Sequence, residues 1–141
     1  MEIEVRPYKD SDYEALVSVY KKSKEFAFDP ETDARERIAE KIRRDPESIL
    51  VMMYGEELWG SVSIIEDGRI AILFRWVAAT KEINNEQVLE GLLSKAQNIL
   101  RKKGYREVHC MAPSQNAESS ILRTGMGFNA GDQYSWFWKK L

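Results

Sequence analysis

The segment from Arg75 to Gly104, RWVAATKEINNEQVLEGLLSKAQNILRKKG, decides the fold, because it joins the end of a strand to a long amphipathic helix. Apolar residues in its second half recur every three or four positions and form one stripe. Asn84 is a typical N-cap residue, and Gly104 stands where a left-handed C-cap is expected. Residues 105–111 then predict another strand. A strand, a helix and a strand in this order predict a parallel pair joined by a right-handed crossover.

The remaining segments predict two helices before an antiparallel meander, and a helix and a strand at the end. Ser11 and Glu14 have the spacing of a capping box at the start of the first helix. The second helix is expected to stop before Pro46. In chain order we expect a strand ending at Pro7, helices over about 12–24 and 34–44, strands over 49–54, 58–65 and 70–77, the strand–helix–strand unit, a helix over 116–124 and a strand over 134–140.

Composition restricts the class of protein. Apolar residues make up 43% and charged residues 31%, which is the balance of a globular chain, and we expect one domain over residues 1–141. The net charge of −2 and the interleaving of basic with acidic residues disfavour nucleic acid as a partner. One cysteine and one histidine leave no set of zinc ligands. Without a signal peptide or a long apolar run, the chain is expected to be cytoplasmic and not bound to a membrane.

Three segments resemble one family when they are taken together. They are Val5-Arg6-Pro7, Leu58-Trp59-Gly60-Ser61-Val62, and the spaced motif Asn116-x-x-Ser119-x-x-Leu122-Arg123-x-x-x-Gly127-Phe128. In order and spacing they resemble the GCN5-related N-acetyltransferase (GNAT) superfamily, over essentially the whole chain. The resemblance implies an α+β fold. Its centre would be a mixed, mostly antiparallel sheet of about six or seven strands, flanked by about four helices.

The same resemblance implies acetyl-CoA as the cofactor. In this superfamily the strand that matches residues 70–77 hydrogen-bonds the pantetheine arm through its backbone. The following loop holds the pyrophosphate on backbone N–H groups at a helix N-terminus. The residues that would bind the cofactor here are therefore Arg75, Trp76, Val77, Asn84, Asn85, Glu86, Gln87, Val88, Leu89 and Asn116.

The loop departs from the family pattern R/Q-x-x-G-x-G/A. Asn84 stands at the Arg or Gln position, and Asn85 and Gln87 stand at glycine positions. Glycine lets a phosphate approach the backbone and adopts a positive φ freely, whereas asparagine does so less readily and glutamine hardly at all. Glu82 and Glu86 oppose a diphosphate, although glutamate early in a helix also stabilises the helix dipole. We interpret this loop as a well-capped helix start with a degenerate pyrophosphate site.

The residues for acid–base chemistry are not assigned by the sequence. Acetyl transfer needs a neutral amine and a proton for the leaving thiolate. Arg123 stands where many relatives carry a tyrosine acid, and a guanidinium does not give up its proton. His109 is a candidate base if it faces the cleft, and Ser119 is a candidate contact of the thiol. Each also has a purely structural interpretation: Arg123 as a solvated helix residue, His109 as an exposed histidine and Ser119 as a helix cap.

Aromatic residues bear on the acceptor. Phe26 and Phe28 lie between the first two predicted helices, where relatives build the acceptor wall. Tyr134, Trp136 and Trp138 alternate along the predicted last strand, as core or homodimer-interface residues would. If Phe26, Tyr134 or Trp76 lines an open cleft, the acceptor is an apolar or aromatic amine, either a small molecule or a peptide.

Two functions remain open from the sequence. The first is an acetyl-CoA-dependent N-acetyltransferase that transfers an acetyl group to an amine by direct attack in a ternary complex. The second is a catalytically silent GNAT-fold module for binding or oligomerisation, which has lost tight CoA binding. The interpretation leans towards the enzyme, because relatives vary widely in loop and base, and because direct attack requires little of the side chains.

Overall fold

A computed structural model describes residues 2–23, 28–112 and 120–141. Three residues discussed above, Phe26, Asn116 and Ser119, lie outside the described residues. The chain divides into two compact units, Met1–Met111 and Ala112–Leu141, and each is described by itself. That both belong to one domain stays a prediction.

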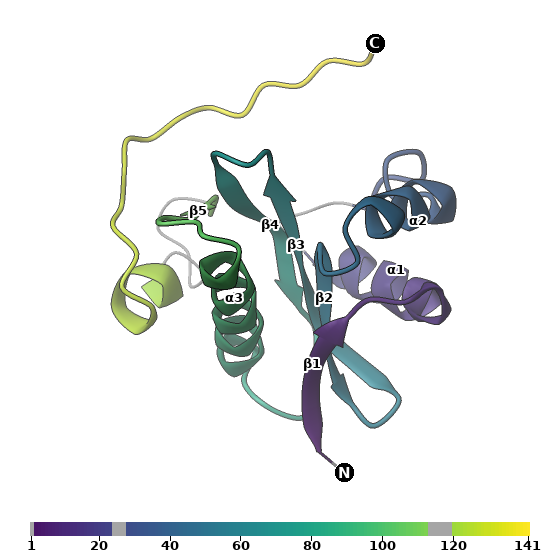
Figure 1. Cartoon of the computed structure of the whole chain (residues 1–141). Helices are drawn as coiled ribbons and strands as arrows, with labels where there is room; N and C mark the ends of the chain where they lie inside the picture. Colours follow the sequence, from purple (N-terminus) through teal and green to yellow (C-terminus); the bar gives the residue numbers. More distant parts are fainter. Residues whose placement is uncertain (1, 24–27, 113–119) are drawn as a thin grey trace. The chain divides into compact units, whose positions relative to one another are not determined.

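The first unit contains a mixed sheet (Figure 1). Within the described residues its strands are β1 (Ile3–Pro7), β2 (Ile49–Tyr54), β3 (Glu57–Glu66), β4 (Ala71–Ala78) and β5 (His109–Cys110). They lie in the order β1-β2-β3-β4-β5. The first four are antiparallel neighbours, and β5 runs parallel to β4, as the crossover predicts. The α+β class with a mixed, mostly antiparallel sheet is confirmed.

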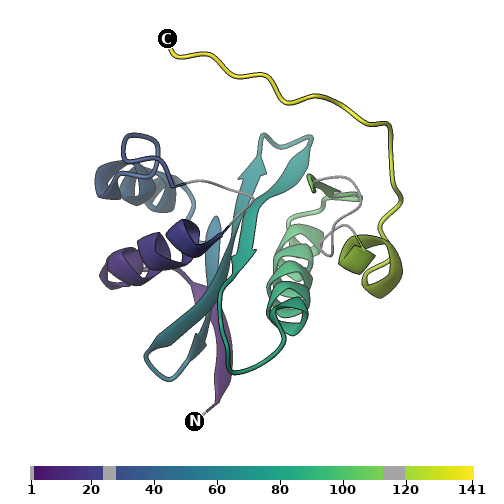
Figure 2. The same ribbon diagram turned by 180° about the vertical axis from the view of Figure 1, so that it is seen from behind.

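The helices cover both faces of this sheet. They are α1 (Tyr13–Lys22), α2 (Arg35–Arg44) and α3 (Asn85–Lys102), with a short 3₁₀ helix, η1 (Asp10–Asp12), before α1. Figures 1 and 2 show α1 and α2 on one side of the sheet and α3 on the other. On the first side, α1 buries Leu16, Val19 and Tyr20 in a core shared with β2 and Val77 of β4. On the other side, the apolar stripe of α3 is buried as its period predicts.

The predicted capping box at Ser11 is wrong. Ser11 is exposed within η1, and Asp12 organises this turn instead. Its carboxylate accepts the backbone N–H of Lys9 at 2.9 Å and pairs with both terminal nitrogens of Arg6, at 2.8 and 2.9 Å. A bidentate guanidinium–carboxylate pair is stronger than a bond from a neutral hydroxyl, so the aspartate takes the position. Burial alone would raise the pKa of Asp12, but these bonds hold it below its ordinary value.

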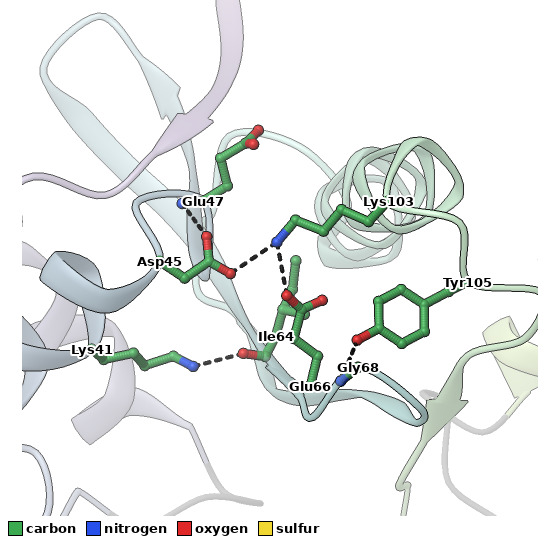
Figure 3. Close-up of polar contacts among 8 residues, drawn as sticks. All are labelled: Lys41, Asp45, Glu47, Ile64, Glu66, Gly68, Lys103 and Tyr105. Atoms are coloured by element: carbon green, nitrogen blue, oxygen red, sulfur yellow. Dashed lines mark hydrogen bonds and ion pairs between the residues drawn. The ribbon is translucent and has the colours of Figure 1, made fainter.

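Both ends of α3 follow the prediction. The Asn84 side chain accepts the backbone N–H of Glu86 at 2.9 Å, and Gly104 has the left-handed φ of 95°. At the far end, Lys103 lies 2.9 Å from both Asp45 and Glu66 and so joins α3 to the end of α2 and to β3 (Figure 3). These paired charges lie at the end of α3 opposite to its capped start.

The second unit contains a short π-helix, η2 (Ile121–Gly125), followed by residues 126–141 without a strand or helix. Gly127 has a φ of 72°, and the N–H of Phe128 closes the turn on the carbonyl of Leu122 at 2.8 Å. The predicted strand over 134–140 is wrong. A strand persists only where a neighbour pairs its backbone, and Tyr134 and Trp138 are largely exposed. The homodimer stays a prediction.

The sheet is therefore smaller than the six or seven strands predicted. The terminal strand is not formed in the described residues, and the predicted strand over 105–111 is reduced to His109–Cys110. The sequence of β5 explains this in part, because charged residues precede it at Arg106 and Glu107 and both are exposed. No helix among the described residues is both long and apolar enough to cross a membrane.

Candidate functional site

The strand β4 has a partner on both sides for only part of its length. It pairs with β5 at Ile72–His109 and Leu73–Cys110, and in the described residues this pairing does not continue beyond Leu73. The next contact between the two segments is made by a side chain, because the indole N–H of Trp76 donates to the carbonyl of Met111 at 3.0 Å. Among the described residues, no strand therefore lies beside residues 74–78 on this edge of β4.

A β-bulge interrupts β4 at this point. Between the pairs Ser61–Val77 and Ser63–Phe74, two residues of β4 oppose one residue of β3. One of the two is Arg75, which has a φ of 49°, the left-handed region that non-glycine residues rarely adopt. Such a conformation costs an arginine about 1–2 kcal/mol, and strained residues of this kind persist only where surrounding contacts fix them.

Those contacts come from α1 and from the loop between α1 and α2. The Arg75 guanidinium lies 2.5 Å from the Asp33 carboxylate and 5.3 Å from the centre of the Tyr20 ring. The two charged side chains are 15% and 7% exposed, so the pair is shielded from water. Asp33 also accepts the backbone N–H of Asp29 at 2.9 Å, and its carbonyl accepts the Tyr13 hydroxyl at 2.8 Å. Charge and hydrogen bonds thus join β4 to the loop.

The loop between β4 and α3 is closed by its own side chains. Asn85 accepts the backbone N–H of Thr80 at 3.1 Å, and the Thr80 hydroxyl accepts that of Glu82 at 3.1 Å. The Asn84 side chain caps Glu86, and the Asn84 carbonyl accepts the N–H of Gln87 at 3.0 Å, so four N–H groups of this loop and helix start already have an acceptor. A phosphate that binds here has to share these donors with the side chains or replace the side chains.

The sequence matches no family model and no curated protein. The structure, in contrast, is similar to many solved acetyltransferases. PaiA N-acetyltransferase from Thermoplasma acidophilum, solved in complex with coenzyme A, has a TM-score of 0.77 at 22% identity and covers 95% of this chain and 94% of its own. The ribosomal-protein-S18-alanine N-acetyltransferase from Escherichia coli has a TM-score of 0.71 at 15% identity, covering 93% and 80%. Glucosamine-6-phosphate N-acetyltransferase from Arabidopsis thaliana gives 0.71 at 16%, covering 97% and 99%.

The chain has the GNAT fold. Within this fold, Arg75 is half-buried on β4, and the other predicted cofactor-binding residues that the structure describes fall into two groups. Trp76, Val77, Val88 and Leu89 are buried, each 4% exposed or less, so their side chains fill the core and only their backbone could meet a ligand. Exposed side chains at the start of α3 form the second group: Asn84, Asn85, Glu86 and Gln87.

The candidate catalytic residues are not brought together in the described residues. His109 is exposed on β5, with its Nε2 atom 3.4 Å from the Glu107 carboxylate. Arg123 is exposed in η2, which belongs to the second unit. Cys110, next to His109, is half-buried, and burial raises its pKa to about 12, so it remains a thiol at neutral pH.

Sequence reasoning missed Asp33 and Tyr20 as neighbours of the strand. One signal was present, because Arg75 is the only charged residue in the apolar run 70–77. A charge in such a run has to find a partner when the strand is buried. The identity of that partner, 42 positions away in the sequence, follows only from the folded chain.

Proposed function

We propose that the protein is an acetyl-CoA-dependent N-acetyltransferase that acts on an amine by direct attack in a ternary complex. The observation that carries the proposal is that, among the described residues of a GNAT fold, the pairing of β4 with β5 ends at Leu73, before the strand leads into the start of an 18-residue helix. A structural neighbour with this fold binds coenzyme A. An edge of β4 that lacks a strand neighbour offers backbone groups to an extended ligand such as a pantetheine arm.

In this proposal the donor lies along β4 and ends at α3. Backbone groups of Arg75, Trp76 and Val77 face the pantetheine arm, and the amides at Asn84–Gln87 face the diphosphate. The positive end of the α3 dipole favours an anion there. Glu82 and Glu86, together with the side-chain acceptors already in place, oppose it. We therefore expect weaker affinity than a glycine-rich loop would give.

The chemistry consists of one transfer between two bound molecules. The neutral amine attacks the thioester carbonyl carbon, a C–N bond forms, the C–S bond breaks, and the proton lost by the nitrogen is taken up by the thiolate, through water where no side chain intervenes. His109, on β5, is the proposed side chain that takes this proton from the nitrogen and passes it on to the thiolate. The acceptor molecule is a small-molecule or peptide amine, the substrate class named for the plant and bacterial structural neighbours.

Calorimetric titration with acetyl-CoA and with free CoA tests this proposal. Binding at a ligand concentration ten times Kd should stabilise the protein by about 1.4 kcal/mol, which is a rise in melting temperature of roughly 4 °C for a chain of this size. No heat at millimolar ligand, together with no thermal shift, refutes the proposal and favours the catalytically silent module.

The loop itself is tested by Gln87→Gly. Removal of this side chain opens one glycine position of the family pattern, so CoA should bind more tightly. Gln97→Gly is a matched control, because it makes the same change in the same helix away from the loop. Both variants lose about 1 kcal/mol of helix stability, and only the first should change affinity. Unchanged or weaker binding by Gln87→Gly contradicts the steric explanation of the loop.

A further inference from the structure

One side chain links the two faces of the proposed site. The backbone of Arg75 belongs to β4, two residues beyond the last described pair with β5, whereas its guanidinium reaches Asp33 in the loop 28–34. The same guanidinium lies over Tyr20 of α1, whose hydroxyl is hydrogen-bonded to Ser63 of β3. The arginine therefore contacts the donor strand, the first helix and the loop at once.

The strain at this position indicates that the contact is specific. A glycine would adopt a φ of 49° without strain, and the strand would keep its bulge. The arginine holds the same conformation because its side chain is fixed by a buried carboxylate and an aromatic ring. The carboxylate is itself fixed, since it also caps the turn at Asp29.

The arrangement of layers gives this contact a consequence. The start of α3 and the loop 28–34 lie on opposite sides of the sheet (Figures 1 and 2). In the proposed function, a donor held at the start of α3 and passing beside β4 would have its thioester near the sheet edge that the α1 side also borders. An amine that reached the thioester from that side would pass the loop 28–34, which the Arg75–Asp33 pair joins to β4.

We propose that Arg75 is a positioning residue that holds the loop 28–34 against the donor strand and so sets where the acceptor amine meets the thioester. The inference rests on the proposed function. It assigns no chemical step to Arg75 and none to Asp33. They affect where the acceptor amine is held, so their loss should raise the amine KM and leave the affinity for acetyl-CoA nearly unchanged.

The decisive variants are Arg75→Gly, which keeps the backbone conformation and removes the contact, and Asp33→Asn, which leaves β4 unaltered. Arg6→Gly is the matched control, because the Arg6–Asp12 pair is similarly shielded, with side chains 19% and 8% exposed, and ties β1 to the turn before α1. Hydrogen exchange of the loop 28–34 is measured first, on the free protein. Both decisive variants should exchange there at least tenfold faster than the wild type, and the control should not.

Kinetics then separate the two proposals. Asp33→Asn should raise the amine KM at least fivefold and leave the Kd of acetyl-CoA within twofold. Arg75→Lys should raise the amine KM less than Arg75→Gly does, because lysine keeps the charge. Unchanged exchange in both decisive variants overturns the positioning role, as does an unchanged amine KM. A wild type that binds no acetyl-CoA refutes the proposed function, and the exchange measurement, which needs no ligand, still decides whether Arg75 holds the loop.

Discussion

Replacement of Gly60 by alanine should destabilise the protein at the point where β3, β4 and α3 meet. An added Cβ would lie 2.6 Å from the carbonyl oxygen of Val77, 2.7 Å from Cγ1 of Val88 and 3.0 Å from Cδ1 of Leu92. Favourable carbon contacts begin at about 3.5 Å. The two side chains belong to α3 and the oxygen to the backbone of β4, so relief requires movement of the helix or the strand.

The magnitude follows from this overlap. Extra atoms forced into a packed core cost about 1–3 kcal/mol, and here three atoms are too close, one of which is fixed in the backbone. We expect a loss of about 2 kcal/mol from the free energy of unfolding, with a fall in melting temperature of roughly 6–8 °C. Urea unfolding followed by circular dichroism measures it, with a lower midpoint and an unchanged slope.

Gly91→Ala is the matched control. Its new Cβ would meet only the terminal methyl of Met52, at 2.5 Å, and a flexible methionine can turn aside. Because Gly91 lies inside α3, alanine gains about 1 kcal/mol of helix propensity, and this variant should be as stable as the wild type or more so. A Gly60→Ala protein as stable as the wild type, or less affected than Gly91→Ala, refutes the reasoning.

Three further predictions concern single side chains. Cys110, whose pKa burial raises to about 12, should react with iodoacetamide at pH 8 at least a hundredfold more slowly in the folded than in the urea-unfolded protein, and equal rates would contradict its burial. Burial alone would raise the pKa of Asp45, but the ion pair with Lys103 opposes this and the pKa is lowered, so Lys103→Met should reduce the free energy of unfolding by about 1 kcal/mol at pH 7. In urea unfolding at a series of pH values, this difference should disappear as the pH falls below 3.8 and Asp45 is protonated. A difference that persists at low pH would exclude the ion pair as its cause. Tyr8→Phe should be neutral or stabilising by up to about 1 kcal/mol in urea unfolding, because the Tyr8 hydroxyl is buried without a hydrogen bond in the described residues, and a clear loss would reveal a hidden partner.

Local patterns predicted the parts of the fold that depend on neighbours in sequence. The strand over 49–54 is found at its predicted bounds, and Asn84 caps α3, because alternation, apolar periodicity and capping act over a few residues. The turn before α1 was mispredicted for a related reason. Ser11 fits the local motif, but Asp12 is selected by an ion pair with Arg6, which lies on a separate strand.

The candidate site was harder to predict, since its geometry depends on contacts between distant segments. The positive φ of Arg75, the bulge and the ion pair with Asp33 arise only when β4, β3 and the loop 28–34 meet. The glycine-free loop was identified from the sequence, but not the hydrogen bond from the Thr80 N–H to the Asn85 side chain that closes it. The prediction of a strand over 134–140 was wrong because strand propensity does not supply a pairing partner.

The order of strands in the sheet has a consequence for how the chain folds. Because neighbours in the sheet are also neighbours in the sequence of strands, β3 can pair with β2, and β4 with β3, as soon as each is synthesised. The connections, residues 55–56 and 67–70, are short, so the loss of chain entropy on closing them is small. These hydrogen-bonding edges are therefore exposed only briefly during synthesis. β1 waits for β2 across residues 8–48, and β5 has to wait because its parallel pairing requires that α3 first fold back across the sheet.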